Sequence, residues 1–467
     1  MNEFGEEYNR EEMRALLKKF ESMVAADAFV FFDVDEYEEL IEYYFQAQQS
    51  DLLEKAIDSA LQQYPGKSVF NISKAQYLAS QNKMDEALQL LNDIEIENPT
   101  EGDIYTTRGA IYSQLGLSEQ AIENFKTALK YSDLKEDIYT SLGTEFMNKN
   151  DFDSSLYYLK KGFSLNPENE MIIGEIAICY ELSGKNDDSV KFFEQFCDNY
   201  PYNKWAWFNL GIAYNRLQLY EKAVEAYDFA ITIDPTFSSA YFNKGNSFAM
   251  LGQYMEAIAV YKETFNHEEP DPSAYYYIGE CYENLEDFSN ALAHYNRAVK
   301  LNPEMADAWI SIGIVLDKQN RLTEGIHYVK KALELEPENP DYWYVFAEIE
   351  EKMGFIEEAL GAYQKVIELN YSDYDVWLDY SNCLIGAGYL QDALHALSEG
   401  IKYFPEAADL HYRMSAILVE SGKRQEALTH LQSALLLDYD KHQELFNYAP
   451  ELKTDKGFIE VINTYKR

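Results

Sequence analysis

The stretch Lys204–Phe237, KWAWFNLGIAYNRLQLYEKAVEAYDFAITIDPTF, decides the fold of this 467-residue chain. It contains two sets of apolar and small residues, each with the three- and four-residue spacing of one α-helix face. The first set is Trp207, Leu210, Gly211 and Tyr214, and the second set is Ala223, Tyr227 and Ala230. Pro235 ends the second set, because proline lacks the amide hydrogen that a helix needs and clashes with the preceding turn. The stretch therefore predicts two short amphipathic helices joined by a tight turn.

The same pattern recurs along the chain with a 34-residue step and without an insertion. Multiples of 34 separate Pro65, Pro99, Pro167, Pro201, Pro235, Pro303, Pro337 and Pro405. One track of small residues is Ala75, Gly109, Gly143, Ala177, Gly211, Gly245, Gly279, Gly313, Ala347, Ser381 and Ser415. A second track is Ala87, Ala121, Ser155, Ser189, Ala223, Ala257, Ala291, Gly325, Ala359, Ala393 and Ala427. Three tracks in phase indicate a solenoid, in which each unit buries its apolar face only against its neighbours.

The glycine of the first helix indicates a packing requirement. Gly211 costs its helix about 1 kcal/mol relative to alanine, yet glycine recurs at this place in five other units. We expect the missing side chain to let the first helix approach the second closely, with Ala223 serving the same purpose from the second helix.

The sequence resembles that of the tetratricopeptide repeat proteins. Their motif places an aromatic residue, a Leu-Gly pair and a tyrosine on the first helix, then Ala, an aromatic residue and Ala on the second, and then proline. In the stretch quoted above the motif reads Trp207, Leu210-Gly211, Tyr214, Ala223, Tyr227, Ala230 and Pro235. The resemblance, which is to long bacterial members, implies an all-α, right-handed superhelical solenoid of helix–turn–helix units.

We expect twelve contiguous units at residues 34–441, between capping segments at residues 1–33 and 442–467. Caps are needed because terminal repeats otherwise expose an apolar face. The first cap contains an amphipathic helix, Asn9–Val24, and the second ends in a helix that carries Phe458, Ile459, Ile462 and Tyr465. The alternative for either segment is a helix that docks a partner. A displaced turn at Pro270–Pro272 predicts an irregularity within the array and not a domain boundary.

The charge of the chain limits its partners. The formal net charge is −42, with 81 Asp and Glu against 39 Lys and Arg. Such a field repels nucleic acid and anionic membranes and attracts basic segments. In the simpler alternative, many of these carboxylates only solvate helix surfaces. Because there is no apolar run of membrane-spanning length and no signal-peptide pattern, we expect no membrane insertion and a cytoplasmic location, with four reduced cysteines.

The sequence contains no phosphate-binding loop, dinucleotide fingerprint, His-Glu-x-x-His or Cys-x-x-Cys motif. Asp33 and Asp35 are spaced like calcium ligands but lack the glycine and the remaining oxygen ligands of a calcium loop, so helix capping explains them better. We therefore expect no enzyme, no cofactor and no metal site.

The family resemblance implies a binding site. In tetratricopeptide proteins the first helices line a concave groove through the second, fifth, sixth, ninth and twelfth residues of each unit. The corresponding residues here are Trp205, Phe208, Asn209, Ile212, Asn215, Phe242, Asn243, Asn246, Tyr276, Tyr277, Glu280, Glu283, Asp317, Glu348 and Glu351. The family's clamp for a terminal carboxylate needs lysines, but Phe208 and Phe242 occupy those places, so we exclude that binding mode.

The chemistry of these side chains predicts the ligand. Asparagine amides both donate and accept hydrogen bonds, which suits the backbone of an extended peptide. The alternative is that the amides bond within the solenoid. Farther along, Asp317, Glu348, Glu351 and Asp379 make the expected groove acidic, which favours a ligand that carries Lys or Arg.

Two functional hypotheses follow. The first is a non-enzymatic adaptor that binds an extended or helical, basic protein segment in the groove. The second is a structural scaffold that acts through its convex face or its ends, and self-association of the chain stays open.

Overall fold

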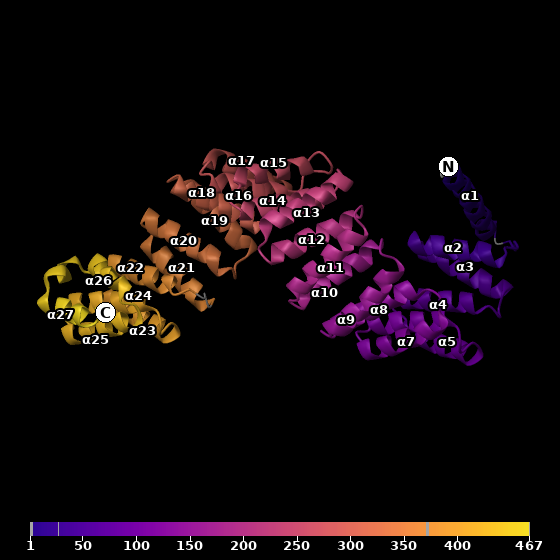
Figure 1. Cartoon of the computed structure of the whole chain (residues 1–467), viewed down its shortest axis with the longest axis horizontal. Helices are drawn as coiled ribbons and strands as arrows, with labels where there is room; N and C mark the ends of the chain where they lie inside the picture. Colours follow the sequence, from indigo (N-terminus) through magenta and orange to yellow (C-terminus); the bar gives the residue numbers. More distant parts are fainter. Residues whose placement is uncertain (1–2, 27, 370–372, 467) are drawn as a thin grey trace. The chain divides into compact units, whose positions relative to one another are not determined.

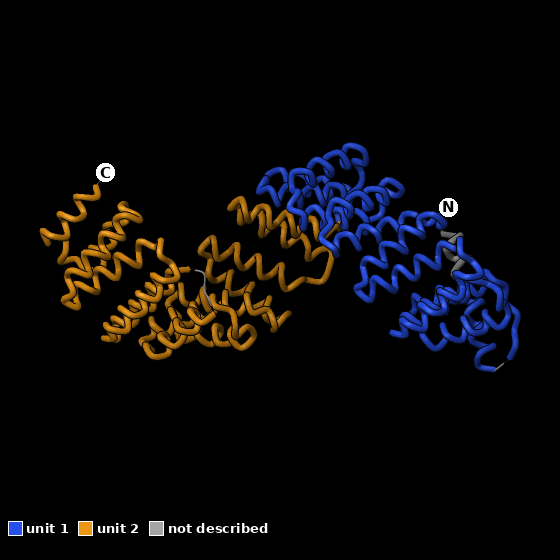
Figure 2. Tube along the Cα trace, turned by 90° about the horizontal axis from the view of Figure 1, so that it is seen from below, with its two compact units in different colours: residues 1–235 blue, residues 236–467 orange. Residues whose placement is uncertain are grey.

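The computed structural model describes residues 3–26, 28–369 and 373–466, with side chains described from residue 12 onward. Residues 1, 2, 27 and 467 of the expected capping segments lie outside this set. The regular elements of the described residues are all helices (Figure 1), which confirms the predicted all-α repeat fold. The chain divides into two compact units, residues 1–235 and 236–467 (Figure 2).

The helices of the first unit are α1 (Glu3–Ala26), α2 (Val34–Gln46), α3 (Ser50–Gln63), α4 (Ser68–Ser80), α5 (Met84–Glu97), α6 (Gly102–Gln114), α7 (Ser118–Tyr131), α8 (Lys135–Asn148), α9 (Phe152–Leu165), α10 (Glu170–Leu182), α11 (Asn186–Asn199), α12 (Lys204–Arg216) and α13 (Tyr220–Ile233). The α-helices of the second unit are α14 (Ser238–Met250), α15 (Tyr254–Thr264), α16 (Pro272–Asn284), α17 (Phe288–Leu301), α18 (Ala306–Lys318), α19 (Leu322–Leu335), α20 (Pro340–Met353), α21 (Ile356–Glu368), α22 (Asp375–Gly386), α23 (Leu390–Tyr403), α24 (Ala408–Glu420), α25 (Arg424–Leu437), α26 (Gln443–Tyr448) and α27 (Lys456–Thr464). Two short 3₁₀ helices, η1 (Asp440–His442) and η2 (Pro450–Thr454), flank α26.

From α2 to α25 the helices form pairs that repeat with the 34-residue step of the sequence. The second helices of the pairs begin at Ser50, Met84, Ser118, Phe152, Asn186, Tyr220, Tyr254, Phe288, Leu322, Ile356, Leu390 and Arg424, which reproduces that step at every interval. Within each unit every helix of these pairs packs against the next one in the chain. Each pair therefore buries its apolar face against its sequence neighbours, as a solenoid requires.

The small residues of the first helices lie where a second helix crosses. A Cβ atom added to Gly211 would come within 2.5 Å of the Tyr227 ring, and one added to Gly245 within 2.6 Å of the Tyr261 ring. No room is left there for a methyl group unless the aromatic ring moves. The predicted packing reason for these glycines is confirmed.

The turn inside each pair contains one residue in the left-handed region of the backbone. These residues are Gln48, Asn82, Gly116, Asn150, Gly184, Gln218, Gly252, Glu286, Asn320, Gly354, Gly388 and Gly422, with φ between 54° and 84°. They too recur with the 34-residue step, so the turn has one geometry throughout the described pairs. Half of these positions are occupied by a residue other than glycine, for which this conformation carries a steric cost.

Helix α1 covers the first pair, as the amphipathic pattern at Asn9–Val24 predicts. Phe20 is fully buried in a cluster that also contains Tyr37 and Tyr44. Asp33 caps α2: its side chain accepts a hydrogen bond from the amide of Glu36, whose side chain accepts one from the amide of Asp33. This reciprocal capping box confirms the capping interpretation of Asp33.

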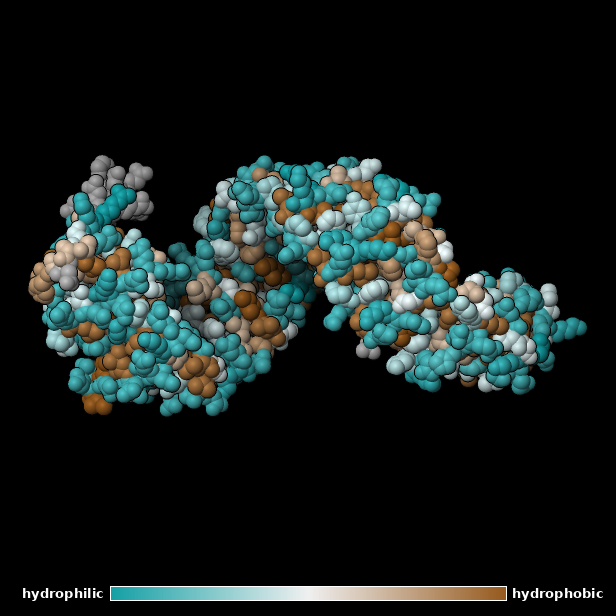
Figure 3. Space-filling view, turned by 180° about the vertical axis from the view of Figure 1, so that it is seen from behind, coloured by the Kyte–Doolittle hydropathy of each residue, from teal (hydrophilic) through white to brown (hydrophobic). Residues whose placement is uncertain are grey.

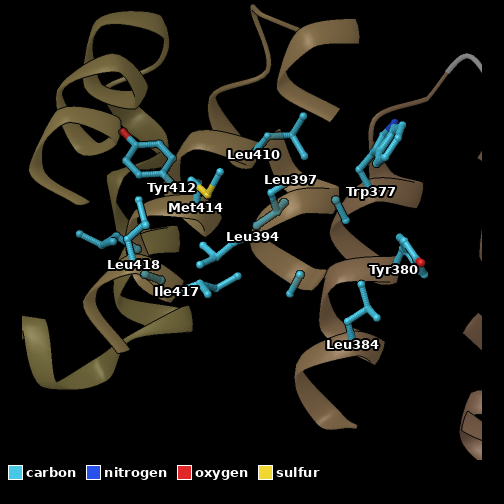
Figure 4. Packing of buried hydrophobic residues seen from close by; sticks show 14 of the residues in the cluster. Trp377, Tyr380, Leu384, Leu394, Leu397, Leu410, Tyr412, Met414, Ile417 and Leu418 are labelled. Atoms are coloured by element: carbon cyan, nitrogen blue, oxygen red, sulfur yellow. The ribbon is translucent and has the colours of Figure 1, made fainter. Parts of the chain in front are cut away.

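The last pair is covered by the segment that follows α25. Phe458 and Ile462 of α27 are buried in the same cluster as Leu410, Tyr412 and Leu431. Figure 4 shows the labelled part of this cluster, in which side chains from successive helices converge on the space between them. The closing helix expected at the C-terminal end is therefore present and packed.

The turn at Pro270–Pro272 is irregular, as the sequence predicts. Helix α15 has 11 residues, whereas the second helices on either side have 14. Asp271 caps α16, and Pro272 occupies its first turn, where proline is tolerated. The boundary between the two compact units lies elsewhere, between Pro235 and Thr236.

The four cysteines are buried free thiols. Figure 3 shows one face of the molecule, on which hydrophilic residues predominate and hydrophobic residues form separate patches. Across the described residues, each helix is too short or too polar to pass through a membrane.

Candidate functional site

The predicted groove residues belong to first helices of both compact units. Helix α12 of the first unit carries Trp205, Phe208, Asn209, Ile212 and Asn215, and helices α14, α16, α18 and α20 of the second unit carry the other ten.

The aromatic residues of α12 form a partly buried cluster. The ring of Phe208 lies 6.0 Å from that of Trp205 and 5.9 Å from that of Tyr227, which belongs to the second helix of the pair. The ammonium of Lys204 lies 5.3 Å from the Trp205 ring and pairs with Asp234 at 2.8 Å. Ile212 is also partly buried. These side chains offer an apolar surface with fixed geometry.

The asparagines are bonded within the solenoid, as the alternative interpretation of them holds. Asn209 is only 6% exposed, and its amide donates to the carbonyl of Trp205 at 2.8 Å. The amide of Asn243 donates to the carbonyl of Ser239 at 2.9 Å. Asn209 therefore lies too deep to present its amide to a ligand, which differs from our expectation.

Two further asparagines bond to tyrosine hydroxyls. Asn215 donates to the hydroxyl of Tyr227 at 3.1 Å, and Asn246 accepts from the hydroxyl of Tyr261 at 2.6 Å. Each bond uses part of the hydrogen-bonding capacity of the asparagine amide. These two amides therefore keep only some of their donors and acceptors for a ligand.

The aromatic surface of the second unit is larger. Tyr277 lies 5.4 Å from Phe242 and stacks on Tyr261 at 6.0 Å between centroids. On the same helix Tyr276 lies 5.6 Å from Tyr295. Large, rigid and amphipathic rings of this kind provide contact area at low cost in conformational entropy.

Tyrosines of the second helices hold acidic residues of the first. The hydroxyl of Tyr295 donates to Glu283 at 2.8 Å, and that of Tyr363 donates to Glu351 at 2.9 Å. Burial raises the pKa of both tyrosines, so their hydroxyls keep their protons and act as donors. Sequence reasoning missed these bonds, although the carboxylate precedes the tyrosine by the same interval of 12 in both pairs.

Lysines of the next pair neutralise two of the predicted acidic residues. Glu283 pairs with Lys318 at 2.8 Å, and Asp317 pairs with Lys352 at 2.6 Å. In both cases the lysine follows the carboxylate at an interval of 35 in the sequence. In the first unit Arg216 pairs with Glu181 across the same interval. This ladder of ion pairs offsets part of the negative charge of the predicted groove residues.

Glu280 of α16 and Glu348 of α20 are different, because neither side chain has a hydrogen-bond or ion-pair partner within the described part of the chain. Burial raises the pKa of Glu280, and the negative charges of Glu283 and Asp307 add to this effect. Burial likewise raises the pKa of Glu348, and Lys352 opposes the shift. Both are partly buried carboxylates that a cation from outside the chain would stabilise.

The described side chains include no group of three or more His, Cys, Asp or Glu residues arranged to hold a metal ion. The arrangement on α16–α20 is thus one of aromatic rings, paired acidic residues and two unpaired carboxylates, which suits recognition of another chain.

Family models confirm the resemblance seen in the sequence. Models of the tetratricopeptide repeat match residues 102–133, 175–201, 205–237, 226–259, 272–305 and 306–339. The chain belongs to the tetratricopeptide repeat family. Tetratricopeptide repeats are generally non-enzymatic modules that bind other proteins or peptides.

Two curated relatives match part of this tetratricopeptide repeat protein. It is 24% identical over 200 residues to the BBSome complex member BBS4 of Bos taurus. This matched stretch covers 42% of this chain and 38% of that protein. It is 20% identical over 133 residues to the general transcriptional corepressor trfA of Dictyostelium discoideum, covering 28% of this chain and 10% of that protein. The matched stretches thus span well under two thirds of either relative. A solved tetratricopeptide repeat protein from Parabacteroides merdae is 14% identical, covers 54% of this chain and 99% of its own, and has a TM-score of 0.42.

Proposed function

We propose that this chain is a non-enzymatic adaptor that binds an extended or helical protein segment bearing Lys or Arg along its first helices. The observation that carries the proposal is a pair of unpartnered, partly buried carboxylates that lie near tyrosine rings. Glu280 lies near Tyr276 and Tyr277 on α16, and Glu348 lies near Tyr344 on α20. A Lys or Arg side chain at either carboxylate would form a charge-assisted hydrogen bond, and the aromatic rings would contact its aliphatic stem.

The net charge of −42 supports the same ligand class, because it attracts basic segments over a distance and disfavours nucleic acid. The proposal includes no cofactor. It places the protein in the cytoplasm, where the four buried free thiols fit a reducing compartment.

The test compares three forms of the full chain as baits in affinity capture from native lysate. They are the wild type, the variant Glu280→Gln/Glu348→Gln and the control Glu256→Gln/Glu358→Gln. The control removes the same charge from exposed positions on second helices. Each capture is washed at about 0.05 M and about 0.5 M salt, because salt screens exposed charge pairs at the higher concentration.

A protein that the wild type and the control retain at low salt, and that the groove variant and high salt both release, would support the adaptor. Equal retention of the same proteins by all three baits would refute binding at Glu280 and Glu348. Circular dichroism of each bait shows whether a loss of binding comes with a loss of helix.

A scaffold that acts through its ends is the second candidate, and one observation favours it. Phe29 and Phe31, in the segment before α2, are 74% and 65% exposed. Exposed aromatic residues of this kind mark contact surfaces. If this candidate holds, Phe29→Ser/Phe31→Ser will abolish self-association or partner capture that Glu280→Gln/Glu348→Gln leaves intact, as measured by light scattering and by the capture assay.

A further inference from the structure

Arg413 of α24 is a partly buried cation with incomplete bonding. One guanidinium nitrogen donates to the amide oxygen of Asn382, and the guanidinium carbon lies 4.3 Å from the centre of the Tyr448 ring. The Nε atom is shielded from solvent and has no hydrogen-bond partner. Burial lowers the pKa of this guanidinium, and the nearby Tyr448 and Glu420 oppose the shift.

No carboxylate lies within ion-pair distance of Arg413 among the described residues, although the chain carries 81 acidic residues. Other cations of this unit have such partners: Lys318 with Glu283, Lys352 with Asp317 and Lys441 with Asp409. A partly buried guanidinium without a carboxylate at ion-pair distance is costly, and a carboxylate supplied from outside would offset that cost.

A pocket of about 380 Å³ lies beside this guanidinium. Its walls are Ile385 of α22, Ala416, Ile417 and Val419 of α24, and Tyr448 and Ala449 at the end of α26, with Glu420 and Glu451 also on its lining. Arg413, Ala416 and Val419 are the sixth, ninth and twelfth residues of their predicted unit. They therefore occupy the same face of a first helix as the predicted groove residues.

We propose that Arg413 receives the side-chain carboxylate of an aspartate or glutamate in the bound segment. This inference rests on the proposed function and adds the charge order of the ligand: basic residues at Glu280 and Glu348, followed by an acidic residue at Arg413. The apolar walls of the pocket accommodate the methylene groups of the acidic side chain, and its carboxylate pairs with the guanidinium of Arg413.

The positions of the three residues also give a spacing. Glu280, Glu348 and Arg413 lie on α16, α20 and α24, so each is two helix pairs from the next. Helices pack about 8–10 Å apart, so two pairs advance the groove by roughly 20 Å, which an extended chain covers in about six residues. The expected ligand thus carries two basic positions and then one acidic position at intervals of about six residues.

The experiment selects phage-displayed peptides of about 18 residues, long enough for the three positions when extended, on the full chain. The peptides are fused to the coat protein at their carboxyl ends, so they offer only side-chain carboxylates. Selections are run in parallel on the wild type, Arg413→Gln, Arg413→Lys and Glu280→Gln/Glu348→Gln. Arg413→Lys keeps the positive charge but loses the planar group that packs on Tyr448, so it separates the effect of charge from that of packing.

We expect wild-type selections to be enriched in Lys or Arg and in an Asp or Glu toward one end of the peptide. Arg413→Gln should lose only the acidic enrichment, Arg413→Lys should keep it, and the groove variant should lose only the basic enrichment. The best wild-type peptide should bind Arg413→Gln about tenfold more weakly, which corresponds to about 1.4 kcal/mol.

Acidic enrichment that persists in Arg413→Gln, or wild-type peptides with basic enrichment alone, would overturn the inference and leave the proposed function standing. Selections without enrichment over a blank surface would overturn both. A further test replaces the acidic residue of the best peptide with lysine. If Arg413→Glu binds this altered peptide and the wild type does not, the two side chains form one charge pair, which would support the inference.

Discussion

Glu286 occupies the left-handed turn between α16 and α17, at φ 57°. A side chain in this conformation costs roughly 1–2 kcal/mol, and glycine avoids that cost while adding about 0.4–1 kcal/mol of chain entropy to the unfolded state. We therefore predict that Glu286→Gly raises the free energy of unfolding by about 0.5–1 kcal/mol. Urea unfolding followed by circular dichroism measures it.

The matched control is Gly252→Ala at the equivalent turn of the preceding pair, where φ is 72°. An added Cβ there would meet open space, so only backbone strain is introduced. This substitution should lower stability by about 1 kcal/mol. Two substitutions with effects of the same sign would contradict the strain argument.

His411 and His430 contact each other through their Nδ1 atoms at 3.0 Å, an arrangement that requires one ring to donate and the other to accept. Burial lowers the pKa of His411, and the neighbouring His430 adds to this shift. Burial also lowers the pKa of His430, opposed by the nearby Glu426. The folded state therefore binds protons less readily than the unfolded state, whose imidazoles titrate near 6.5.

The sign of the pH effect follows from linkage. Above about pH 6.5 both rings are neutral in both states, and as the pH falls through 6.5 the unfolded chain gains protons first, so stability falls. The midpoint of thermal unfolding should fall between about pH 7.5 and 5.5 in the wild type, and it should fall less in His411→Gln/His430→Gln. An equal decrease in both proteins would show that other groups cause it. NMR titration of the two imidazoles would locate their pKa values directly.

At the residue scale the sequence predicts contacts between the small and aromatic residues that recur in every helix pair, and it misses bonds between polar side chains, both within a pair and between pairs. The approach of Gly211 to Tyr227 follows from the 34-residue step and the need for a small residue. The pairing of Glu283 with Lys318 joins two helix pairs and depends on which rotamers two long side chains adopt, and nothing in the periodic pattern specifies that. For the same reason Glu280 could not be distinguished from Glu283 before the structure was known.

At the scale of single elements, α27 depends on its first turn. Asp455 accepts hydrogen bonds from the amides of Gly457 and Phe458, and both of its carboxylate oxygens accept from Arg424 at 2.7 Å. Arg424 lowers the pKa of Asp455 to about 2, mainly through these bonds. The contribution is therefore present above the ordinary pKa of 3.8 and is lost as the pH falls toward 2.

We predict that Asp455→Ala destabilises α27 by about 1 kcal/mol, the usual cost of losing an N-cap. Hydrogen exchange followed by mass spectrometry should show faster exchange in residues 456–464, while the amides of α14–α20 stay unchanged. If exchange in α27 is unaffected, the cap does not hold the helix. Acidification of the wild type to about pH 3 should begin to reproduce the effect of the substitution.

Helix starts are the part of the fold that could be predicted most closely. The first helices begin at or within one residue of the predicted unit starts, for example Lys204 for α12 and Asp375 for α22. The left-handed turn residues were less visible, because glycine marks only half of them and Asn, Gln or Glu occupy the rest. The polar residues at these turns are not part of the periodic apolar pattern, so that pattern does not predict their left-handed conformation.

At the scale of the whole molecule, charge dominates. Even if all 39 Lys and Arg side chains were paired, 42 of the 81 acidic side chains would have no counterpart, and their mutual repulsion opposes folding. Salt weakens both this repulsion and the ladder of ion pairs, but exposed pairs contribute only about 0–1 kcal/mol each. We predict that the midpoint of thermal unfolding rises between about 0.01 M and 0.3 M sodium chloride, over which the screening length falls well below the size of the chain.

Differential scanning calorimetry across that salt range measures this effect. A falling midpoint would mean that the ion pairs outweigh the repulsion.

The division between Pro235 and Thr236 was not visible in the sequence, because the 34-residue step continues across it unchanged. It depends on how contacts cluster in three dimensions, which a periodic pattern does not encode.

The constant interval between the starts of the second helices has a consequence for how such a chain can change over generations. Removal or duplication of 34 consecutive codons, wherever the cut falls within the array, joins one helix pair to an equivalent point of another and keeps every later residue in phase. Unequal crossing-over between similar segments of the gene would therefore yield a shorter or longer protein that still folds. The number of pairs, and with it the length of partner that the surface can hold, becomes a quantity that recombination adjusts in whole steps, while point substitutions adjust what each step recognises.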